Sequence, residues 1–271
     1  MGNIFQKGLS ILLTKQSNIL SAAFVIAATV IISQILGLIR QRLLVSIFGA
    51  SDTLGVYLAS SRLPDFLFQL VIAGALSSAF IPVFSEYLDK EKYEEANRLG
   101  SSLLALGLIT FFILGVILFV FAHQFSTLIA PGFSKSHVDL MAHLTRIIIA
   151  GELVFIIGSF FSVILQSYNH FFIPGIASAL YNLGIILGIK LLSPVFGISS
   201  AAYGVVFGAT IFALIQLPMI KRVGFSFKPV LSFKTKGVMD VLKLMIPRTL
   251  SIGVFQLGTL LIVTLISFLP A

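Results

Sequence analysis

Long apolar stretches occupy most of this chain, and several of them contain an arginine or a carboxylate. About 20 apolar residues in a helix are enough to cross the hydrocarbon core of a bilayer. A charged side chain in mid-bilayer costs about 3 kcal/mol even on lenient insertion scales, so its presence marks a structural or functional need. The pattern therefore predicts a membrane protein that crosses the bilayer many times and holds polar groups among its helices.

The fold class that we expect is all-α: a polytopic membrane helical bundle of about seven transmembrane helices. The ten-residue alternation typical of membrane β-barrels is missing from the apolar runs. The first run is too long for the apolar core of a signal peptide, which spans about 7–15 residues, so we expect it to remain as a helix. The predicted spans lie near residues 19–48, 53–85, 99–125, 138–167, 172–191, 198–220 and 240–268.

Composition narrows the function classes. Hydrophobic residues make up 58% of the 271 residues and charged residues only 10%, whereas a soluble domain has about 25% charged residues. The net charge of +8 does not predict a nucleic-acid partner, because no basic patch with interleaved aromatics lies outside the apolar runs. Membrane lipids with anionic headgroups are the better explanation.

Metal, cofactor and catalytic signatures are not found. The chain has no cysteine, and its four histidines show no ligand spacing, so neither a metal site nor a cofactor is expected. No carboxylate pair or His/Asp cluster has catalytic spacing, so an enzyme is not expected either.

The basic residues between spans predict the orientation. Ten of them fall in segments on the same side as the N-terminus, against two, Lys135 and Lys190, on the other side. Because basic residues accumulate in cytoplasmic loops, we expect a cytoplasmic N-terminus. The ten are Lys7, Lys15, Lys90, Lys92, Arg98, Lys221, Arg222, Lys228, Lys234 and Lys236.

Four regions follow from these spans. We expect a cytoplasmic or interfacial segment at 1–17, with a short helix over Ile4–Leu13, and a six-helix lobe at 18–220. Residues 221–236 form a basic cytoplasmic linker with interleaved phenylalanines, and 237–271 hold a seventh helix. A lone helix after a complete bundle and a linker suggests the start of an incomplete second lobe, completed by a further lobe or by a second copy of the chain.

The first span carries a polar helix face. Ser33, Gly37 and Arg40 are spaced four and three apart and share one face, with Gln34 beside them and Arg42 roughly opposite Arg40. A face of small and polar residues in a lipid-buried helix normally points at other helices or at water. Alternatively, Arg40 extends its charge to the membrane surface.

The second span contains Arg62, Pro64 and Asp65. Pro64 cannot donate its backbone hydrogen bond and is expected to kink the helix. Arg62 and Asp65 are three apart and can pair, so one interpretation is a self-neutralised structural pair. The other is a bent helix that presents a cation to the interior of the bundle.

Glu152 lies near the middle of the fourth span without an oppositely charged neighbour on its own helix face. Such a residue is either protonated or paired across helices, and it often marks an ion or proton path. In the seventh span, Pro247 and Arg248 precede a polar stripe of Thr249, Gln256 and Thr259. Asn182 in the fifth span is expected to hold helices together.

Several motifs resemble those of one family, the lipid II flippases (MurJ, formerly MviN). The matches cover the chain from about residue 18 to its end, and the first hundred residues are the most specific. They include Ser33 to Arg40, Ile47 to Ala50, Arg62 to Pro64, Gly74 to Pro82, Glu86-Tyr87, Ala130 to Phe133, Asn169, Phe172 to Pro174, Asn182 and Gln256.

The resemblance implies two helical lobes around a cationic cavity. Such a protein would flip the undecaprenyl-pyrophosphate-linked glycopeptide, lipid II, outward across the bacterial cytoplasmic membrane by alternating access, in cell wall biosynthesis. By position, Arg40 matches a cavity arginine of the family and Arg62 a basic position in its second helix. Our expected substrate-binding residues are Arg40, Arg62, Arg248 and Glu152, although Glu152 matches no family position.

Departures from the family keep two alternatives open. Gln34 and Phe68 stand where many members carry arginine, Gly55 where many carry aspartate, and Gln41 and Ala73 where many carry an acid. The alternatives are an exporter of another lipid-linked glycan or a drug, and a degenerate or accessory half-protein without transport activity.

Overall fold

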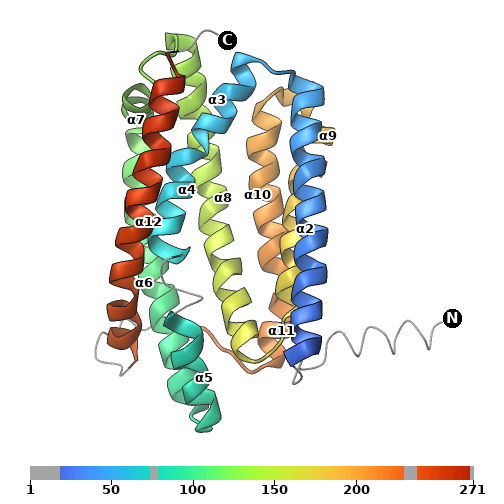
Figure 1. Ribbon diagram of the computed structural model, residues 1–271, viewed down its shortest axis with the longest axis vertical. Coiled ribbons are helices and arrows are strands. Elements are labelled where there is room, and N and C mark those ends of the chain that lie inside the picture. The colour runs from blue at the N-terminus through green and yellow to red at the C-terminus, as the bar shows by residue number, and fades with distance from the viewer. Residues whose placement is uncertain (1–18, 74–78, 229–236, 269–271) are drawn as a thin grey trace, which may run out of the picture.

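The computed structural model describes residues 19–73, 79–228 and 237–268. All regular elements in these ranges are helices (Figure 1), which confirms the predicted fold class. They are α2 (Ile19–Phe48), α3 (Asp52–Ser60), α4 (Arg62–Phe68), the π-helix η1 (Gln69–Ala73), α5 (Ile81–Asp89), α6 (Tyr93–Val120), α7 (Ala122–Ile129), α8 (Lys135–Ser167), α9 (Phe172–Phe196), α10 (Ser199–Leu214), α11 (Leu217–Arg222) and α12 (Val238–Ile266).

Six stretches of helix in the described ranges are long and apolar enough to cross a membrane. They correspond to six of the predicted spans and comprise α2, α6, α8, α9, α10 with α11, and α12. The longest, α8, has 33 residues, and at about 1.5 Å per residue it is about 50 Å long, more than the bilayer core of about 30 Å. The remaining predicted span, 53–85, is not one helix, so the count of seven stays a prediction.

The second predicted span is broken between α3 and α4, as expected from Pro64. Pro64 has no N–H to donate to the carbonyl of Ser60 four residues earlier. That carbonyl instead accepts a hydrogen bond from Thr145 Oγ1 of α8, at 3.0 Å in the buried interior. The segment then continues as the single π-helical turn η1, an element that is frequent at functional sites.

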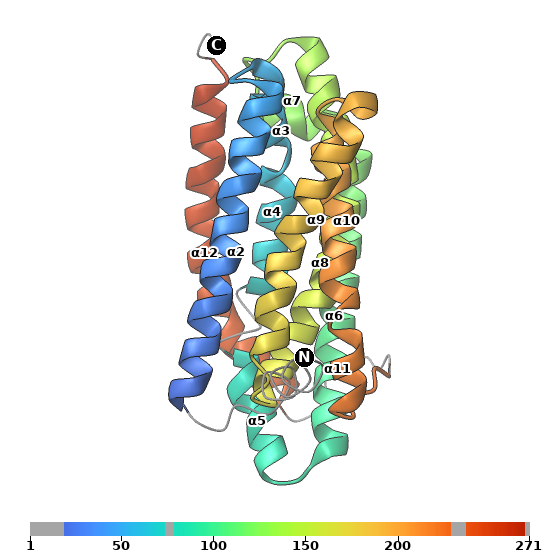
Figure 2. The same cartoon turned by 90° about the vertical axis from the view of Figure 1, so that its right-hand side faces the viewer.

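Helix α8 runs through the middle of the bundle, and Figures 1 and 2 show helices on all sides of it. It packs against α3, α6, α7 and α10. In the second half of α8, the buried side chain of Gln216 joins α8 to α10 by donating to the carbonyls of Gly158 (3.0 Å) and Phe212 (2.8 Å). The central position of α8 among the other helices explains why most of its residues are buried.

Helices α9 and α10 approach closely through glycines. A Cβ atom on Gly184 would lie 2.5 Å from Cα of Gly208, and one on Gly188 would lie 2.4 Å from Cα of Gly204. Each pair is spaced four apart and therefore shares a helix face. Small residues at membrane helix interfaces let backbones approach and gain dispersion contacts.

Helix α2 packs against α9 and leaves its other faces open. A Cβ on Gly175 would lie 2.1 Å from Thr29 Oγ1, so the two helices touch there. Outward-facing side chains such as Leu20 and Phe24 are 79% and 74% exposed. Such exposure is unfavourable in water but costs nothing against lipid tails, so it supports a membrane-embedded bundle.

Exposed lysines lie at both ends of the bundle. The start of α2, α5, α11 and the start of α12 lie at one end (Figure 1), and the exposed Lys90, Lys92 and Lys221 belong to that end. Lys135 and Lys190 are exposed at the opposite end of their helices. The separation matches the predicted orientation; which end faces the cytoplasm stays a prediction.

The linker and α12 are fastened to the preceding helices. The N–H of Lys228 donates to Ser101 Oγ at 3.1 Å, and Asn97 Nδ2 donates to the carbonyl of Gly224 at 3.4 Å. Residues 229–236, like the predicted segment 1–17 with its Ile4–Leu13 helix, lie outside the described residues. The predicted seventh helix is present as α12, and the predicted domain boundaries stay predictions.

Candidate functional site

The polar face of α2 borders a small cavity, as its spacing predicts. The cavity measures about 190 Å³. Asn182 of α9 closes it and holds α2 in place, because its Nδ2 donates to the carbonyl (3.3 Å) and to Oγ (3.2 Å) of Ser33. The predicted role of Asn182 in joining helices is thereby confirmed. The lining residues are Ser33, Gln34, Gly37, Leu38, Arg40, Gln41 and Asn182.

Arg40 supplies the charge of this cavity. Its side chain is half-buried, and it forms no ion pair within 4.0 Å in the part of the chain that the structure describes. Arg42, two residues further along the helix, is exposed. An arginine held beside a polar cavity without a carboxylate partner keeps its five donors available for an anion.

Arg62 and Asp65 of α4 extend the charged region. Arg62 is exposed and makes no ion pair with Asp65 among the described residues. The self-neutralised pair, one of the two interpretations of this motif, is thus not formed. Asp65 lies within electrostatic range of both Arg62 and Arg40, so α2 and α4 place two cations around one carboxyl group.

Glu152 lies deeper in the same region. Its side chain is 5% exposed, and its Oε2 is buried without a hydrogen-bond partner in the described ranges. Asp65 and Tyr181 lie within electrostatic range of it. The structure therefore brings Arg40, Arg62 and Glu152 to one region, where they surround Asp65.

The fourth predicted site residue, Arg248, belongs to α12, but its side chain lies outside the described part of the structure. The polar residues Gln256 and Thr259, which follow Arg248 in α12, have different hydrogen-bond partners. Gln256 Nε2 donates to Gln69 Oε1 of η1, whereas Thr259 bonds to the carbonyl of Phe255 in its own helix (3.3 Å). Gln256 therefore fastens α12 to the broken second span.

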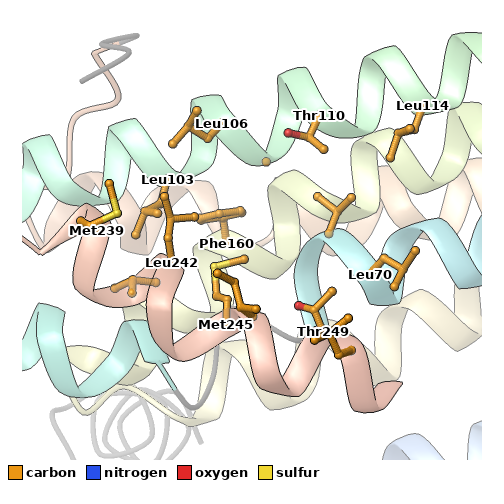
Figure 3. A pocket seen from close by; sticks show the side chains of 15 residues that line it. Leu70, Leu103, Leu106, Thr110, Leu114, Phe160, Met239, Leu242, Met245 and Thr249 are labelled. Atoms are coloured by element: carbon orange, nitrogen blue, oxygen red, sulfur yellow. The ribbon is translucent and has the colours of Figure 1, made fainter. Parts of the chain in front are cut away.

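A second, apolar cavity lies between α6, α8, η1 and α12. It measures about 580 Å³, and its walls carry leucines and methionines with Thr110 and Thr249 as the polar exceptions (Figure 3). The sequence analysis did not identify it, because its walls come from four segments distant in sequence. The lining residues are Leu70, Val71, Leu103, Leu106, Gly107, Thr110, Leu114, Phe160, Met239, Val241, Leu242, Met245, Ile246, Thr249 and Leu250.

Two further residues that join helices, Gln69 and Thr145, were not predicted from the sequence. Gln69 is a polar residue inside the second apolar run, a signal that could have marked it as a partner for Gln256. Thr145 carries no such signal, because threonine is common in membrane helices and its partner is a backbone carbonyl. Within the described ranges, no group of three or more His, Asp or Glu side chains is placed to hold a metal ion.

The helices, the two cavities and the arginines define a class: a polytopic α-helical membrane protein with an arginine beside a polar cavity among its helices. The particular family follows from the sequence. The family described as lipid II flippase MurJ matches residues 44–271, so this chain belongs to the MurJ family. It is a family of flippases and not of enzymes, in agreement with the sequence analysis.

Similar proteins fall in the same family. The probable lipid II flippase MurJ of Buchnera aphidicola subsp. Schizaphis graminum is 34% identical over 240 residues, covering 86% of this chain and 46% of the relative. A solved lipid II flippase MurJ in an inward closed conformation is 27% identical with a TM-score of 0.72, covering 91% of this chain and 51% of that protein. The chain thus spans about half the length of the relatives it matches.

The same architecture occurs in a more distant transporter. The Vibrio cholerae MATE transporter VcmN, in its bent form, has a TM-score of 0.71 at 15% identity, covering 93% of this chain and 57% of that protein. At this identity the likeness extends to the fold alone, so it carries no argument for a drug as substrate.

Proposed function

We propose that this chain forms the first lobe, and the first helix of the second lobe, of a protein that flips lipid II outward across the bacterial cytoplasmic membrane. The single observation that carries the proposal is the unpaired Arg40 beside the polar cavity of α2 and α9, with Arg62 nearby. Membership of the flippase family supports it. The N-terminus would lie in the cytoplasm, where lipid II is made available to the site.

The chemistry of the substrate matches these residues. A pyrophosphate presents pairs of negatively charged oxygens, which the planar guanidinium group of an arginine can bind in a bidentate manner. Arg40 and Arg62 lie on different helices and would grip the group from two sides, and Arg248 would add a third cation from α12. Glu152 would contribute a carboxyl group to the same site.

Transport also requires a second wall for the cavity. Because the chain covers about half of its relatives, we propose that a second lobe, carried by the remainder of the protein or by a second copy of this chain, faces α2 and α12. Two lobes that rock about a fixed site give alternating access. The breaks in the second span at Pro64 and η1 supply a bend where such a motion can occur.

The test is Arg40→Ala in the complete protein. Charge-assisted hydrogen bonds contribute about 1.5–3 kcal/mol, so we expect lipid II flipping in proteoliposomes to fall about tenfold or more. Growth of cells that depend on this flippase should be lost while the protein is still expressed. The matched control is Arg42→Ala, which removes an exposed arginine from the same helix and should leave both readouts unchanged. Unimpaired flipping by Arg40→Ala contradicts the proposal.

A further inference from the structure

Glu152 is the buried ionisable group that pyrophosphate binding does not explain. It lies near the midpoint of α8, it is 5% exposed, and its Oε2 meets no hydrogen-bond donor among the described residues. An ionised carboxylate in such a place loses its hydration without compensation. A carboxylate also repels a pyrophosphate, so Glu152 is unsuited to hold the anion directly.

Two titratable groups interact with Glu152 directly, Asp65 of α4 and Tyr181 of α9. These two in turn interact with Arg62 of α4, Tyr57 of α3 and Arg40 of α2. Five other helices contact α8, namely α5, α6, α7, α10 and α11. The charged side chains of these helices lie near their ends, and the one titratable side chain of α10 is that of Tyr203.

The nearest arginine on α8 itself is already engaged. Nε of Arg146 donates to the carbonyl of Phe119 on α6 at 3.0 Å, and its guanidinium lies 5.7 Å from the centre of the Phe119 ring. Arg146 therefore points to α6. No cation that the structure describes pairs directly with Glu152, and its one charged carboxyl neighbour is Asp65.

Aromatic rings surround the site. Phe155 follows Glu152 by three residues and so shares its helix face. The ring of Phe155 lies 5.3 Å from Phe68, 4.7 Å from Tyr181 and 4.7 Å from Phe212, centre to centre. Glu152 itself is 5% exposed, and poor screening there strengthens its interaction with Asp65.

We propose that Glu152 is a proton-binding site whose occupancy is linked electrostatically to the anion site at Arg40 and Arg62, so that a proton and the pyrophosphate headgroup bind together. The inference rests on the proposed function. When the anionic headgroup occupies the two guanidinium groups, its negative charge disfavours a second negative charge at the buried Glu152, and the carboxylate of Glu152 takes up a proton to become a neutral acid. By linkage, the proton strengthens headgroup binding equally.

A proton fits this site better than a metal cation. Sodium-like and calcium-like ions require several oxygen ligands, and no cluster of three or more His, Asp or Glu side chains with that capacity occurs in the described ranges. One buried carboxylate oxygen without a hydrogen-bond donor among the described residues suffices for a proton. The diester pyrophosphate of lipid II stays ionised near neutral pH, so a proton taken up on binding belongs to the protein.

The experiment counts protons taken up when lipid II binds to the complete protein in detergent. Isothermal titration calorimetry near neutral pH, in buffers of different ionisation enthalpy, gives this number directly. We expect wild-type to take up part of one proton, at most one, and to bind lipid II at least about fivefold more tightly on acidification, the lower end of usual coupling. Glu152→Gln should bind without uptake and without the pH dependence.

The matched control is Glu94→Gln, the same change at an exposed glutamate, which should behave as wild-type. Equal uptake in Glu152→Gln and wild-type overturns the inference, as does binding by wild-type without uptake. Failure of lipid II to bind wild-type counts against the proposed function itself, so the two failures are distinguishable.

A second measurement serves if Glu152→Gln does not fold. Infrared difference spectra of wild-type protein with isotope-labelled glutamate separate its carboxyl bands from those of lipid II. The proposal requires that lipid II binding converts a carboxylate band into a protonated carboxyl band. Spectra without that conversion overturn it.

Discussion

The carbonyl of Ser60 shows how one proline in a membrane helix is compensated. Pro64 leaves this carbonyl without its helical donor, and no water is available in the bilayer core to replace it. Thr145 of α8 supplies the missing donor at 3.0 Å. The broken second span is therefore anchored to the central helix at the level of the break.

We predict that Thr145→Val lowers the free energy of unfolding by about 1–3 kcal/mol, because it leaves a buried carbonyl unsatisfied. Titration with a denaturing detergent in mixed micelles measures this loss. The control is Thr210→Val, since Thr210 Oγ1 bonds at 2.8 Å to the carbonyl of Val206 in its own helix, which the helix backbone also satisfies.

The cause can be checked in a Pro64→Ala background. The restored backbone N–H at position 64 can satisfy Ser60, so Thr145→Val should cost much less there than in wild-type. If Thr145→Val costs no more than Thr210→Val in wild-type, the carbonyl does not depend on Thr145.

The candidate site could be predicted from sequence only where its signals are local. The spacing of Ser33, Gly37 and Arg40 places them on one face whatever surrounds the helix, and the structure confirms a shared cavity. The position of Glu152 in an apolar run made it notable in the same way. The grouping of Glu152 with Asp65 and Arg40 depends on how α2, α4 and α8 pack, which no local pattern contains.

Helices α9 and α10 form their contact from glycines rather than from large side chains. Gly184 and Gly188 meet Gly208 and Gly204 with Cα atoms where side chains would otherwise lie. Because lipid tails are as apolar as the helices, packing rather than burial from water holds this pair together. The contact supports the wall of the polar cavity, since Asn182 lies on α9.

We predict that Gly188→Ala destabilises the protein by about 1–3 kcal/mol, the usual cost of forcing atoms into a packed interface. The added Cβ would lie 2.4 Å from the Cα of Gly204, which is backbone and cannot turn aside. The same detergent titration measures the loss.

Gly55→Ala is the matched control for this prediction. Gly55 is in α3, and a Cβ there meets nothing within 4 Å, so the gain in helix propensity should stabilise the protein by up to about 1 kcal/mol. The prediction requires that Gly188→Ala lowers the free energy of unfolding and that Gly55→Ala raises it. If Gly188→Ala leaves the free energy of unfolding unchanged, α9 and α10 can separate there at little cost.

Helix positions followed from apolar run length, whereas helix breaks did not. Five predicted spans each correspond to one long helix, α2, α6, α8, α9 and α12, and a sixth corresponds to α10 with α11. Pro194 and Pro247 lie inside α9 and α12 without dividing them. The span at 53–85 divides at Ser61 and again at η1. Pro64 predicts the first of these breaks. The π-helical turn η1 could not be predicted, because such a turn depends on tertiary contacts, here with α12.

Helix α12 is the element that we propose begins a second lobe. It touches the preceding helices at three levels: Gly237 lies near Tyr87 at its start, Gln256 bonds to Gln69 in the middle, and Ser267 Oγ accepts from the N–H of Gly132 at 3.2 Å at its end. Its outward faces are open, with Val254 and Phe255 72% and 73% exposed. A second lobe that carries α12 would have to release some of these contacts in order to move.

The contact between η1 and α12 is well suited to test that motion, because the chain has no cysteine of its own. We predict that joining Gln69→Cys to Gln256→Cys in the complete protein, with a short reducible crosslinker, stops lipid II flipping in proteoliposomes and that reduction restores it. The physical reason is that alternating access requires the lobes to rock, and the crosslink would tie α12, which we propose to begin the second lobe, to the broken helix of the first. Each single-cysteine variant, treated with the same reagent, should flip lipid II as the untreated protein does. Flipping at an undiminished rate with the crosslink demonstrably in place would mean that α12 and η1 move together, and α12 would then belong to the first lobe.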